Sequence, residues 1–182
     1  STPVRLDKIA TEVCAAQAAA ALAKDIRLEL EPGDGATVRG NAELLRILLR
    51  NLVDNALRYT PSGGRVLVAI DLIQQGIRLR VSDSGPGIPP EQRALALKRF
   101  HRLAGQAIEG SGLGLSIVAA IAELHGAGLE LGDGLGGQGL GVNGLGGHGG
   151  LGGEPGATGL DVTLTFPPTG TNPRRAPEVP DT

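Results

Sequence analysis

The sequence predicts one α/β domain, and three observations lead to that prediction. Residues 43–60 place apolar side chains at the three- and four-residue spacing of an amphipathic helix. Residues 65–72 and 77–82 alternate apolar and polar side chains on either side of Gln74-Gln75-Gly76, as the two strands of a β-hairpin do. A chain of 182 residues, 41% of them hydrophobic, is long enough to bury one core.

The remaining elements are expected in chain order. A short edge strand at residues 3–6 precedes an alanine-rich helix that Asp7 is expected to cap and that runs to about Lys24. Asn41 is expected to cap the helix of residues 43–60. A further helix is expected at residues 115–125, with Gly126 closing its C-terminal end. A short polar helix is expected at residues 91–102. The further expected strands are residues 26–30, 37–39, 129–131 and 160–166.

Composition excludes several classes of protein. The net charge is −2, from 17 basic and 19 acidic residues, so no nucleic-acid partner and no charged membrane surface are expected. A single cysteine, Cys14, rules out an internal disulfide and fits a reducing compartment. No apolar run reaches the roughly 18 residues that span a bilayer, and no signal peptide is recognisable. Because the sequence opens at Ser1 without methionine, we expect a fragment of a longer protein.

Two segments stand apart from the predicted domain, which we place at residues 1–167. Residues 132–159 hold 15 of the 30 glycines, with leucines recurring between them, and such a segment loses much backbone entropy for little burial. We expect a flexible insertion between two strands; an ordered contact surface is the alternative. Residues 168–182 are rich in proline and are expected to be a disordered tail.

One face of the central helix is unusual. It carries Leu44, Leu48, Asn51, Asn55 and Tyr59, which are three or four residues apart and therefore share one side. Amide groups that point inward need hydrogen-bond partners. The partner is either a bound ligand or another group of the protein, and the residues alone leave both open. Arg46, Arg50 and Asp54 are expected on the opposite, solvated side.

Two glycine-rich motifs have the features of nucleotide contacts. Gly110, Gly112 and Gly114 precede a helix start, where backbone N–H groups can approach a phosphate; a mobile hinge is the alternative. Their spacing is neither the dinucleotide fingerprint nor a Walker A sequence. Asp83 ends a strand just before a glycine-rich turn, where its carboxylate could accept from an exocyclic amine or form a simple Asx turn.

Taken together, the motifs resemble those of a known family. The order is Asn-x-x-x-Asn-Ala-x-Arg-Tyr-Thr from residue 51, Asp-Ser-Gly-Pro-Gly-Ile-Pro from residue 83, Arg-Phe-His-Arg from residue 99 and Gly-Ser-Gly-Leu-Gly-Leu-Ser-Ile-Val from residue 110. This order resembles the N, G1, F and G2 boxes of sensor histidine kinases, in particular the membrane-bound two-component kinases of bacteria. The resemblance covers residues 3–167 apart from the insertion. It implies a two-layer α/β (α+β) sandwich of the Bergerat type, with a mixed, mostly antiparallel sheet and about three helices on one face.

The resemblance also implies ATP and Mg²⁺ as cofactors. Asn55 would coordinate Mg²⁺, and Asn51 would support the same polyphosphate region. Arg58 would contact phosphate, Tyr59 would lie against the nucleotide, and Asp83 would accept the adenine N6 hydrogen. The residues implied in catalysis are Asn51, Arg58, Arg99 and Arg102.

Further roles are implied for the two loops around the nucleotide. Residues 84–109 would form a lid, which Phe100 packs, while Arg99 and Arg102 face the γ-phosphate or the partner domain. The residues implied in the base pocket are Gly85, Gly87 and Ile88, and those implied around the phosphates are Gly110, Ser111, Gly112, Leu113, Gly114 and Leu115.

Departures from the family pattern limit what the chain can do alone. Lys98 stands where the family usually has an acid. The family phosphorylates a histidine on a separate helical dimerisation domain, and none of His101, His125 and His148 lies in such a segment. We therefore expect a domain that is monomeric in isolation and that phosphorylates the histidine of that dimerisation domain, from which a response regulator takes the phosphoryl group. The implied location is the cytoplasmic part of an inner-membrane kinase.

Two alternatives remain from other classes. A gyrase-like ATPase would need a glutamate base at the position of Asn51, whose amide cannot take a proton from water. A binding module without catalysis would have no need of the intact nucleotide motifs.

Overall fold

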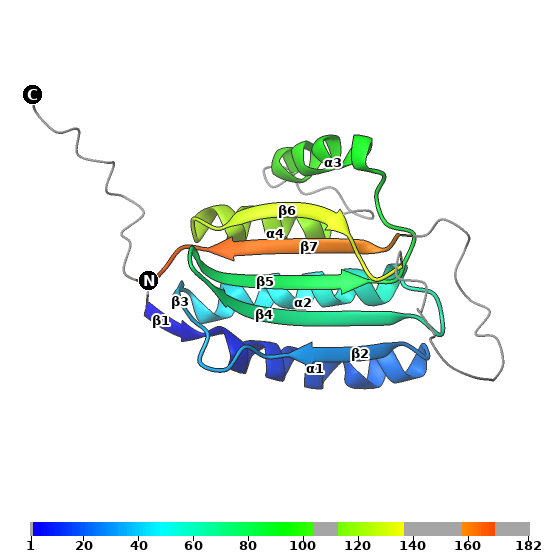
Figure 1. The fold of residues 1–182 in the computed structure, drawn as a ribbon, viewed down its shortest axis with the longest axis horizontal. Coiled ribbons are helices and arrows are strands. Elements are labelled where there is room, and N and C mark those ends of the chain that lie inside the picture. The colour runs from blue at the N-terminus through cyan, green and yellow to red at the C-terminus, as the bar shows by residue number, and fades with distance from the viewer. Residues whose placement is uncertain (1, 104–112, 137–157, 170–182) are drawn as a thin grey trace, which may run out of the picture.

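The computed structural model describes residues 2–103, 113–136 and 158–169, without the side chains of residues 99–103 and 113. A five-stranded sheet has the order β2-β4-β5-β7-β6 (Figure 1). Its only parallel pair, among the described strands, is β2 with β4. The strands are β2 (Arg27–Glu31), β4 (Arg65–Ile73), β5 (Gly76–Asp83), β6 (Gly128–Asp133) and β7 (Leu160–Phe166).

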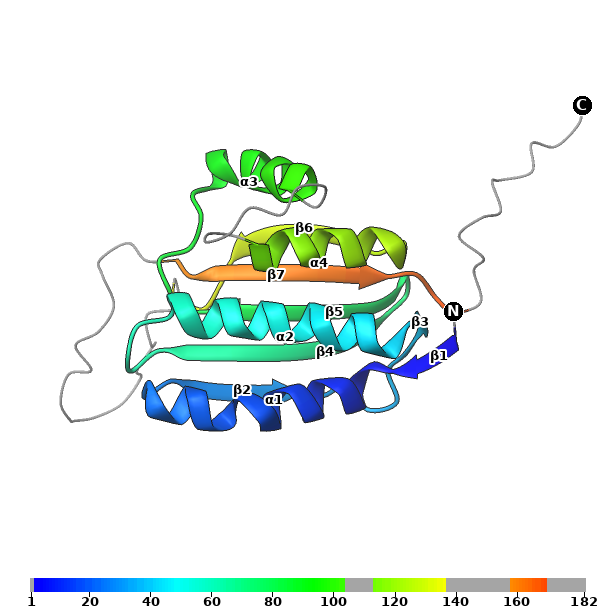
Figure 2. The same ribbon diagram turned by 180° about the vertical axis from the view of Figure 1, so that it is seen from behind.

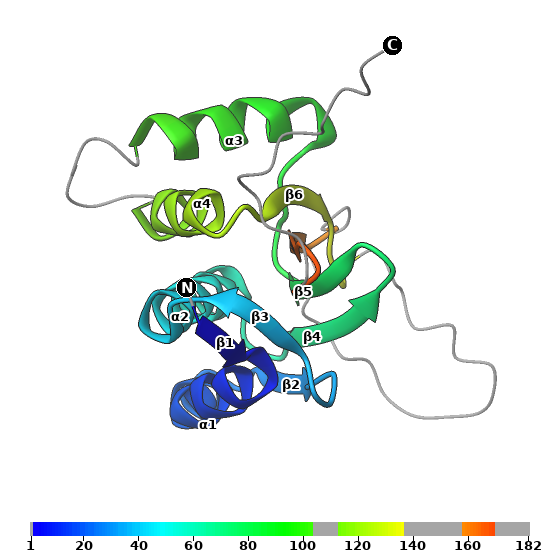
Figure 3. The ribbon, with the colours of Figure 1, turned by 90° about the vertical axis from the view of Figure 1, so that its left-hand side faces the viewer.

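Three helices cover one face of this sheet. They are α1 (Leu6–Ala23), α2 (Ala42–Tyr59) and α4 (Leu113–Leu124). Seen from behind, they lie side by side along the strands (Figure 2). A fourth helix, α3 (Pro90–Leu103), lies outside this layer and packs on α4 and β6 (Figure 3). Strands β1 (Thr2–Arg5) and β3 (Thr37–Gly40) form a separate antiparallel pair. The sandwich with about three helices on one face is therefore confirmed.

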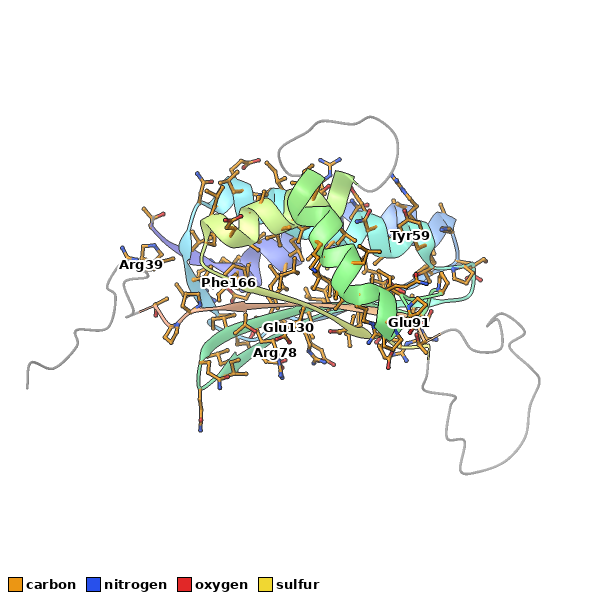
Figure 4. The ribbon with its side chains drawn as sticks, turned by 90° about the horizontal axis from the view of Figure 1, so that it is seen from above. Arg39, Tyr59, Arg78, Glu91, Glu130 and Phe166 are labelled. Atoms are coloured by element: carbon orange, nitrogen blue, oxygen red, sulfur yellow. The ribbon has the colours of Figure 1, made fainter. Side chains whose placement is uncertain are left out.

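The core lies between the helical layer and the sheet. The alternation in β4 and β5 turns every second side chain toward the helices, where Val66, Val68 and Leu79 are fully buried. The apolar side of α2 packs onto them with Leu45, Leu48, Leu49, Leu52 and Val53. Arg78 and Glu130 lie on the opposite, helix-free face (Figure 4), and Arg78 pairs with Asp71 at 3.1 Å.

The hairpin between β4 and β5 is confirmed, with a turn one residue shorter than the predicted Gln74-Gln75-Gly76 connection. Ile73 pairs with Gly76, so Gln74 and Gln75 form the two-residue turn. Gly76 has φ +130°, and a Cβ there would lie 1.9 Å from the carbonyl oxygen of Phe166. Only glycine fits this position, because both the backbone conformation and the neighbouring strand exclude a side chain.

Three helix boundaries differ in how well they were predicted. Asn41 caps α2 as expected, since its Oδ1 accepts from the backbone N–H groups of Glu43 at 2.9 Å and Leu44 at 3.1 Å. The prediction that Asp7 caps α1 is wrong: the cap position is Arg5, and Asp7 lies in the first turn. Its carboxylate accepts instead from the Arg5 guanidinium, at 2.8 Å from Nε, because a charged partner two residues away competes with the helix amides.

The third boundary is that of α4, which begins at Leu113, two residues before the predicted start. Gly114 is thus inside the first helical turn rather than in a loop. Gly126, with φ +63°, follows the helix as predicted, and Ala127 N–H bonds to the carbonyl of Ala122. None of the described helices has the length and apolarity needed to cross a bilayer.

Candidate functional site

A cavity of about 330 Å³ lies between α2 and the ends of β5 and β7. Six of the residues predicted for the site line it: Asn55, Tyr59, Asp83, Gly87, Ile88 and Leu115. The other lining residues are Leu52, Ala56, Val81, Pro86, Leu160 and Val162, which are mainly apolar. A cavity of this size with apolar walls and a few convergent polar groups suits a flat, partly polar small molecule.

The helix and the strands supply opposite walls of this cavity. On α2, Leu52, Asn55 and Tyr59 follow at three- and four-residue steps, so they share the side that faces the sheet. On the sheet, Val81 of β5 pairs with Val162 of β7, and both point to the same face. The polar helix face predicted from the sequence thus meets an apolar strand surface.

Asp83 is the charged group of the cavity. It is buried, with 6% of its surface exposed. Its Oδ1 accepts from the backbone N–H groups of Gly85 at 2.8 Å and Leu160 at 3.1 Å. Its Oδ2 accepts no hydrogen bond from any residue that the structure describes. Burial raises the pKa of the Asp83 carboxyl, and the negative charge of Asp161 adds to the rise, while the two N–H groups oppose it.

Gly85 and Gly87 let the backbone pass close to other walls of the site. A Cβ on Gly85 would lie 2.8 Å from the carbonyl oxygen of Tyr59. Gly87 has φ +73°, and a Cβ there would lie 2.3 Å from the carbonyl oxygen of Gly159. Side chains at these positions would push the turn away from α2 and β7, so the glycines keep the cavity narrow.

Asn55 lies against the first turn of α4. A Cβ on Gly114 would be 2.9 Å from Asn55 Nδ2 and 3.0 Å from Oδ1, so the amide meets the helix start at close range. Asn51 lies one turn earlier and does not line the cavity; its Nδ2 donates to the carbonyl of Ile47 at 2.7 Å. Among the described residues, no group of three or more His, Cys, Asp or Glu could hold a metal ion.

The C-terminal end of α2 is held from outside the site. Lys24, which follows α1 directly, donates from Nζ to the carbonyl oxygens of Leu57 at 2.7 Å and Arg58 at 2.8 Å, which satisfies groups that the end of α2 leaves without a partner in the helix. The Arg58 side chain is exposed and does not line the cavity. Tyr59 lines the cavity but keeps 54% of its surface exposed.

Several predicted residues belong to segments that the structure describes only in part. Arg99, Phe100 and Arg102 lie on α3 by backbone, and Leu113 is the first residue of α4. Gly110, Ser111 and Gly112 lie outside the described residues, as do residues 104–109 of the expected lid and residues 137–157 of the glycine-rich segment.

The sequence reasoning missed how the ends of the glycine-rich segment meet the site. Leu135 N–H donates to the backbone carbonyl of Asp83 at 2.8 Å, and Gly159 N–H donates to the carbonyl of Gly85 at 3.0 Å. A Cβ on Gly134 or Gly159 would lie within 2.4 Å of the Asp83 carbonyl oxygen. The segment is distant from the G1 motif along the chain, but its two described ends form part of the Asp83 wall.

Asp54 faces solvent as predicted, with 43% of its side chain exposed, but it also contacts a neighbouring helix. Its carboxylate accepts from Nε2 of Gln17, a residue of α1. Asp54 thus lies on the side of α2 next to α1 and does not line the cavity. It is therefore not placed to act on a molecule bound there.

Fold and site together define a nucleotide-binding domain of the two-layer sandwich class, with a buried carboxylate at a strand end facing a helix that carries amide groups. The family model of histidine kinase-, DNA gyrase B- and HSP90-like ATPases matches residues 40–170, and the chain belongs to this family.

The relatives narrow the class further. The sensor protein kinase PmrB of Pseudomonas aeruginosa is 44% identical over 139 residues, which are 76% of this chain and 29% of that protein. The structure of the mycobacterial sensor histidine kinase MprB matches with 27% identity and a TM-score of 0.64, over 91% of this chain and 95% of that one. Full-length ShkA in complex with AMPPNP matches with 26% identity and a TM-score of 0.67, over 96% of this chain and 33% of that one. The match is to the catalytic ATP-binding domain of histidine kinases, and the chain spans less than a third of PmrB.

Proposed function

We propose that the chain binds ATP with Mg²⁺ in the α2–β5–β7 cavity and donates the γ-phosphoryl group to a histidine on a separate dimerisation domain. The observation that carries this proposal is the buried Asp83 carboxylate, whose Oδ2 faces no protein donor among the described residues while Oδ1 is fixed by two backbone amides. Kinship with sensor kinases supports the same activity.

The cavity fits an adenine ring. A purine would lie between apolar side chains of α2 and of β5 and β7, with its exocyclic amine donating to Asp83 Oδ2. Guanine carries an oxygen where adenine carries that amine, and two acceptors would then face each other. A carboxylate at this position therefore selects ATP over GTP, because a buried acceptor without a donor costs free energy.

The phosphates would extend from the cavity toward Asn55 and the start of α4. The first N–H groups of a helix are free to bind an anion, and the helix dipole favours negative charge there. Asn55 would hold Mg²⁺ through its amide oxygen, next to Gly114. When bound, Mg²⁺ would neutralise the charge that builds up on the transferred group. The Arg58 side chain, which is exposed at the end of α2, would reach toward the phosphates.

The chain supplies positioning and charge rather than a nucleophile, which is what phosphoryl transfer requires. A gyrase-like hydrolytic function has less support. Asn51 has no basic group, its amide donates to the carbonyl of Ile47, and Asp54 is bound to Gln17 on the far side of the helix. Activation of water has no base in these positions.

The remaining roles follow the family pattern. Arg99, Phe100 and Arg102 of α3, with Gly110, Ser111 and Gly112, would form the lid and the phosphate loop. Residues 1–167 would be one catalytic domain that carries a glycine-rich insertion at residues 132–159, and residues 168–182 a tail. The acceptor histidine and the response regulator would be partners in the cytoplasm, next to an inner membrane, and the isolated domain would be a monomer.

Calorimetric titration with ATP tests the proposal. The chain is titrated with ATP, with and without Mg²⁺, and with GTP as the matched control. Binding that requires Mg²⁺ and prefers adenine is expected. Absence of binding at millimolar ATP would refute the nucleotide site and leave a protein-interaction module as the better explanation.

A further inference from the structure

Arg93 of α3 joins two walls of the cavity and is not part of any motif that the sequence singled out. Its side chain is only 16% exposed although it carries a charge. Its Nε donates to the carbonyl oxygen of Ile88 at 2.9 Å, and its guanidinium also donates to Asp133 Oδ1. A largely buried guanidinium needs acceptors for its hydrogens, and these two acceptors come from different segments.

Both acceptors belong to the frame of the nucleotide cavity. Ile88 lines the cavity itself and lies in the turn that follows Asp83. Asp133 is the last residue of β6 and pairs with Leu160 in the β6–β7 ladder. Leu160 also lines the cavity, and its N–H donates to Asp83 Oδ1. Arg93 thus connects the turn on one side of the Asp83 carboxylate with the strand end on the other.

Arg93 also anchors the start of α3. The helix begins at Pro90, directly after the turn, and packs on α4 and β6 (Figures 1 and 3). Arg93 lies in the first turn of this helix, so its bonds to Ile88 and Asp133 fix the angle at which the helix leaves the cavity rim. The guanidinium bonds a carbonyl and a carboxylate at once because it presents five N–H donors in one plane and carries a charge that strengthens the bond to Asp133.

We propose that Arg93 is a positioning residue for nucleotide binding, which holds the Ile88 turn and the β6–β7 end at the spacing that a purine ring requires. This inference rests on the proposed function, because it concerns the same cavity. Arg93 is not proposed to touch the nucleotide. Its effect passes through Ile88 and Leu160, so it acts on the nucleoside part of the ligand rather than on the phosphates.

The test uses calorimetry to measure the affinities of the wild-type chain and of Arg93→Leu for Mg–ATP, Mg–ADP and AMP. Leucine keeps part of the apolar stem and removes every donor. Affinity is expected to fall about threefold to tenfold, by a similar factor for all three nucleotides, since all share the adenosine group. Arg93→Lys keeps the charge but not the fork and is expected to recover only part of the loss.

Arg78→Leu is the matched control. It removes one positive charge and one ion pair with a carboxylate, on the face of the sheet away from the helices (Figure 4). Both variants lose the same general attraction for anions, so Arg78→Leu measures the effect of net charge alone. Because Arg78 lies away from the cavity, the affinity of this variant for the three nucleotides is expected to stay within about twofold of the wild type.

Asp133→Ala gives a second, independent variant. Asp133 is 60% exposed, so removing it should leave the fold intact. A smaller loss of affinity than in Arg93→Leu is expected, since the bond from Arg93 to Ile88 remains. In the double variant the two losses should be less than multiplicative, because both remove the same contact.

Three results would overturn the inference. Wild-type affinity in both Arg93→Leu and Asp133→Ala would show that the contact does not position the cavity. A loss for ATP without a loss for AMP would show that Arg93 acts on phosphates. An equal loss in Arg78→Leu would show an effect of net charge. If the wild-type chain bound none of the nucleotides, the proposed function itself would fail, which is a separate outcome.

Discussion

Replacing Asp83 by asparagine isolates a single oxygen of the site. Asparagine keeps one carbonyl oxygen, which can still accept from the N–H groups of Gly85 and Leu160 that now bond to Oδ1. The second oxygen becomes an NH₂ group at the position that is free to accept from adenine. The backbone contacts are therefore preserved, while the proposed contact with the ligand changes from acceptor to donor.

The expected loss of ATP affinity follows from that change. A hydrogen bond to a charged acceptor contributes about 1.5–3 kcal/mol, so affinity should fall roughly tenfold to 150-fold. The new NH₂ group can donate to the oxygen of guanine, so the affinity for GTP should rise while the affinity for ATP falls. The ratio of the two affinities should therefore change by a larger factor than the affinity for ATP. Asp83→Ala should lose as much affinity and, in addition, stability, because two buried amides lose their acceptor.

Stability of Asp83→Asn should change in the opposite direction from affinity. Burial raises the pKa of Asp83 above its ordinary value of 3.8, so the folded state binds the proton more tightly than the unfolded chain. The free energy of unfolding of the wild type must then decrease as pH rises from about 3.8 through the folded pKa. Asparagine carries no charge to desolvate, so at pH 7 its melting temperature should equal or exceed that of the wild type.

The assay pairs calorimetry with thermal unfolding between pH 4 and pH 8. Asp161→Asn is the charge-matched control: Asp161 lies on β7 next to β5, accepts from Ser82 and Thr163, and does not line the cavity. It should keep ATP affinity within about twofold. Wild-type ATP affinity in Asp83→Asn would refute the adenine contact, and a clear drop in its melting temperature would refute the account of burial.

Three further predictions concern metal, packing and pH. Asn55→Ala should abolish the Mg²⁺ dependence of ATP binding while circular dichroism shows an intact fold; unchanged Mg²⁺ dependence would count against the metal role. Gly114→Ala should weaken Mg–ATP binding about tenfold or more, because its Cβ would meet the Asn55 amide at 2.9 Å, whereas Gly128→Ala meets nothing within 4 Å and should be neutral. The hydrogen bond from Arg5 holds the pKa of Asp7 below its ordinary value of 3.8, so the stabilisation is complete above about pH 3.8 and is lost as pH falls through the lowered pKa. Asp7→Asn should therefore unfold more easily at pH 7, by on the order of 1–3 kcal/mol in urea, with a smaller difference from the wild type in acid; equal stability at pH 7 would contradict the pairing.

Local pattern alone was enough to predict most of the elements. The alternation of β4 and β5, the hairpin between them and the cap at Asn41 all came from residues close together in sequence, and the structure has them as predicted. The turn is one residue shorter than predicted, because Gly76 already pairs with Ile73. Asp7 shows the limit of this reasoning. A capping residue was assigned from its type and position, but a neighbouring arginine bonds the carboxylate first.

The sequence also determined the family, because four short motifs in a fixed order need no knowledge of the fold. It indicated which face of α2 is polar and that Asp83 ends a strand beside glycines. Each of these features depends on residues within a few positions of one another.

Only the tertiary structure decided how distant segments complete the site. Leu160 reaches Asp83 because β7 pairs with β5. Leu135 and Gly159 bond to the carbonyls of Asp83 and Gly85 because they flank the Asp133–Leu160 pair at which β6 ends and β7 begins. Arg93 meets Asp133 across 40 positions of sequence. Strand pairing and register are set by side-chain packing between elements rather than by local periodicity. The sequence was therefore enough to identify the Asp83 carboxylate as a candidate site residue, but not to identify the segments that hold it in place.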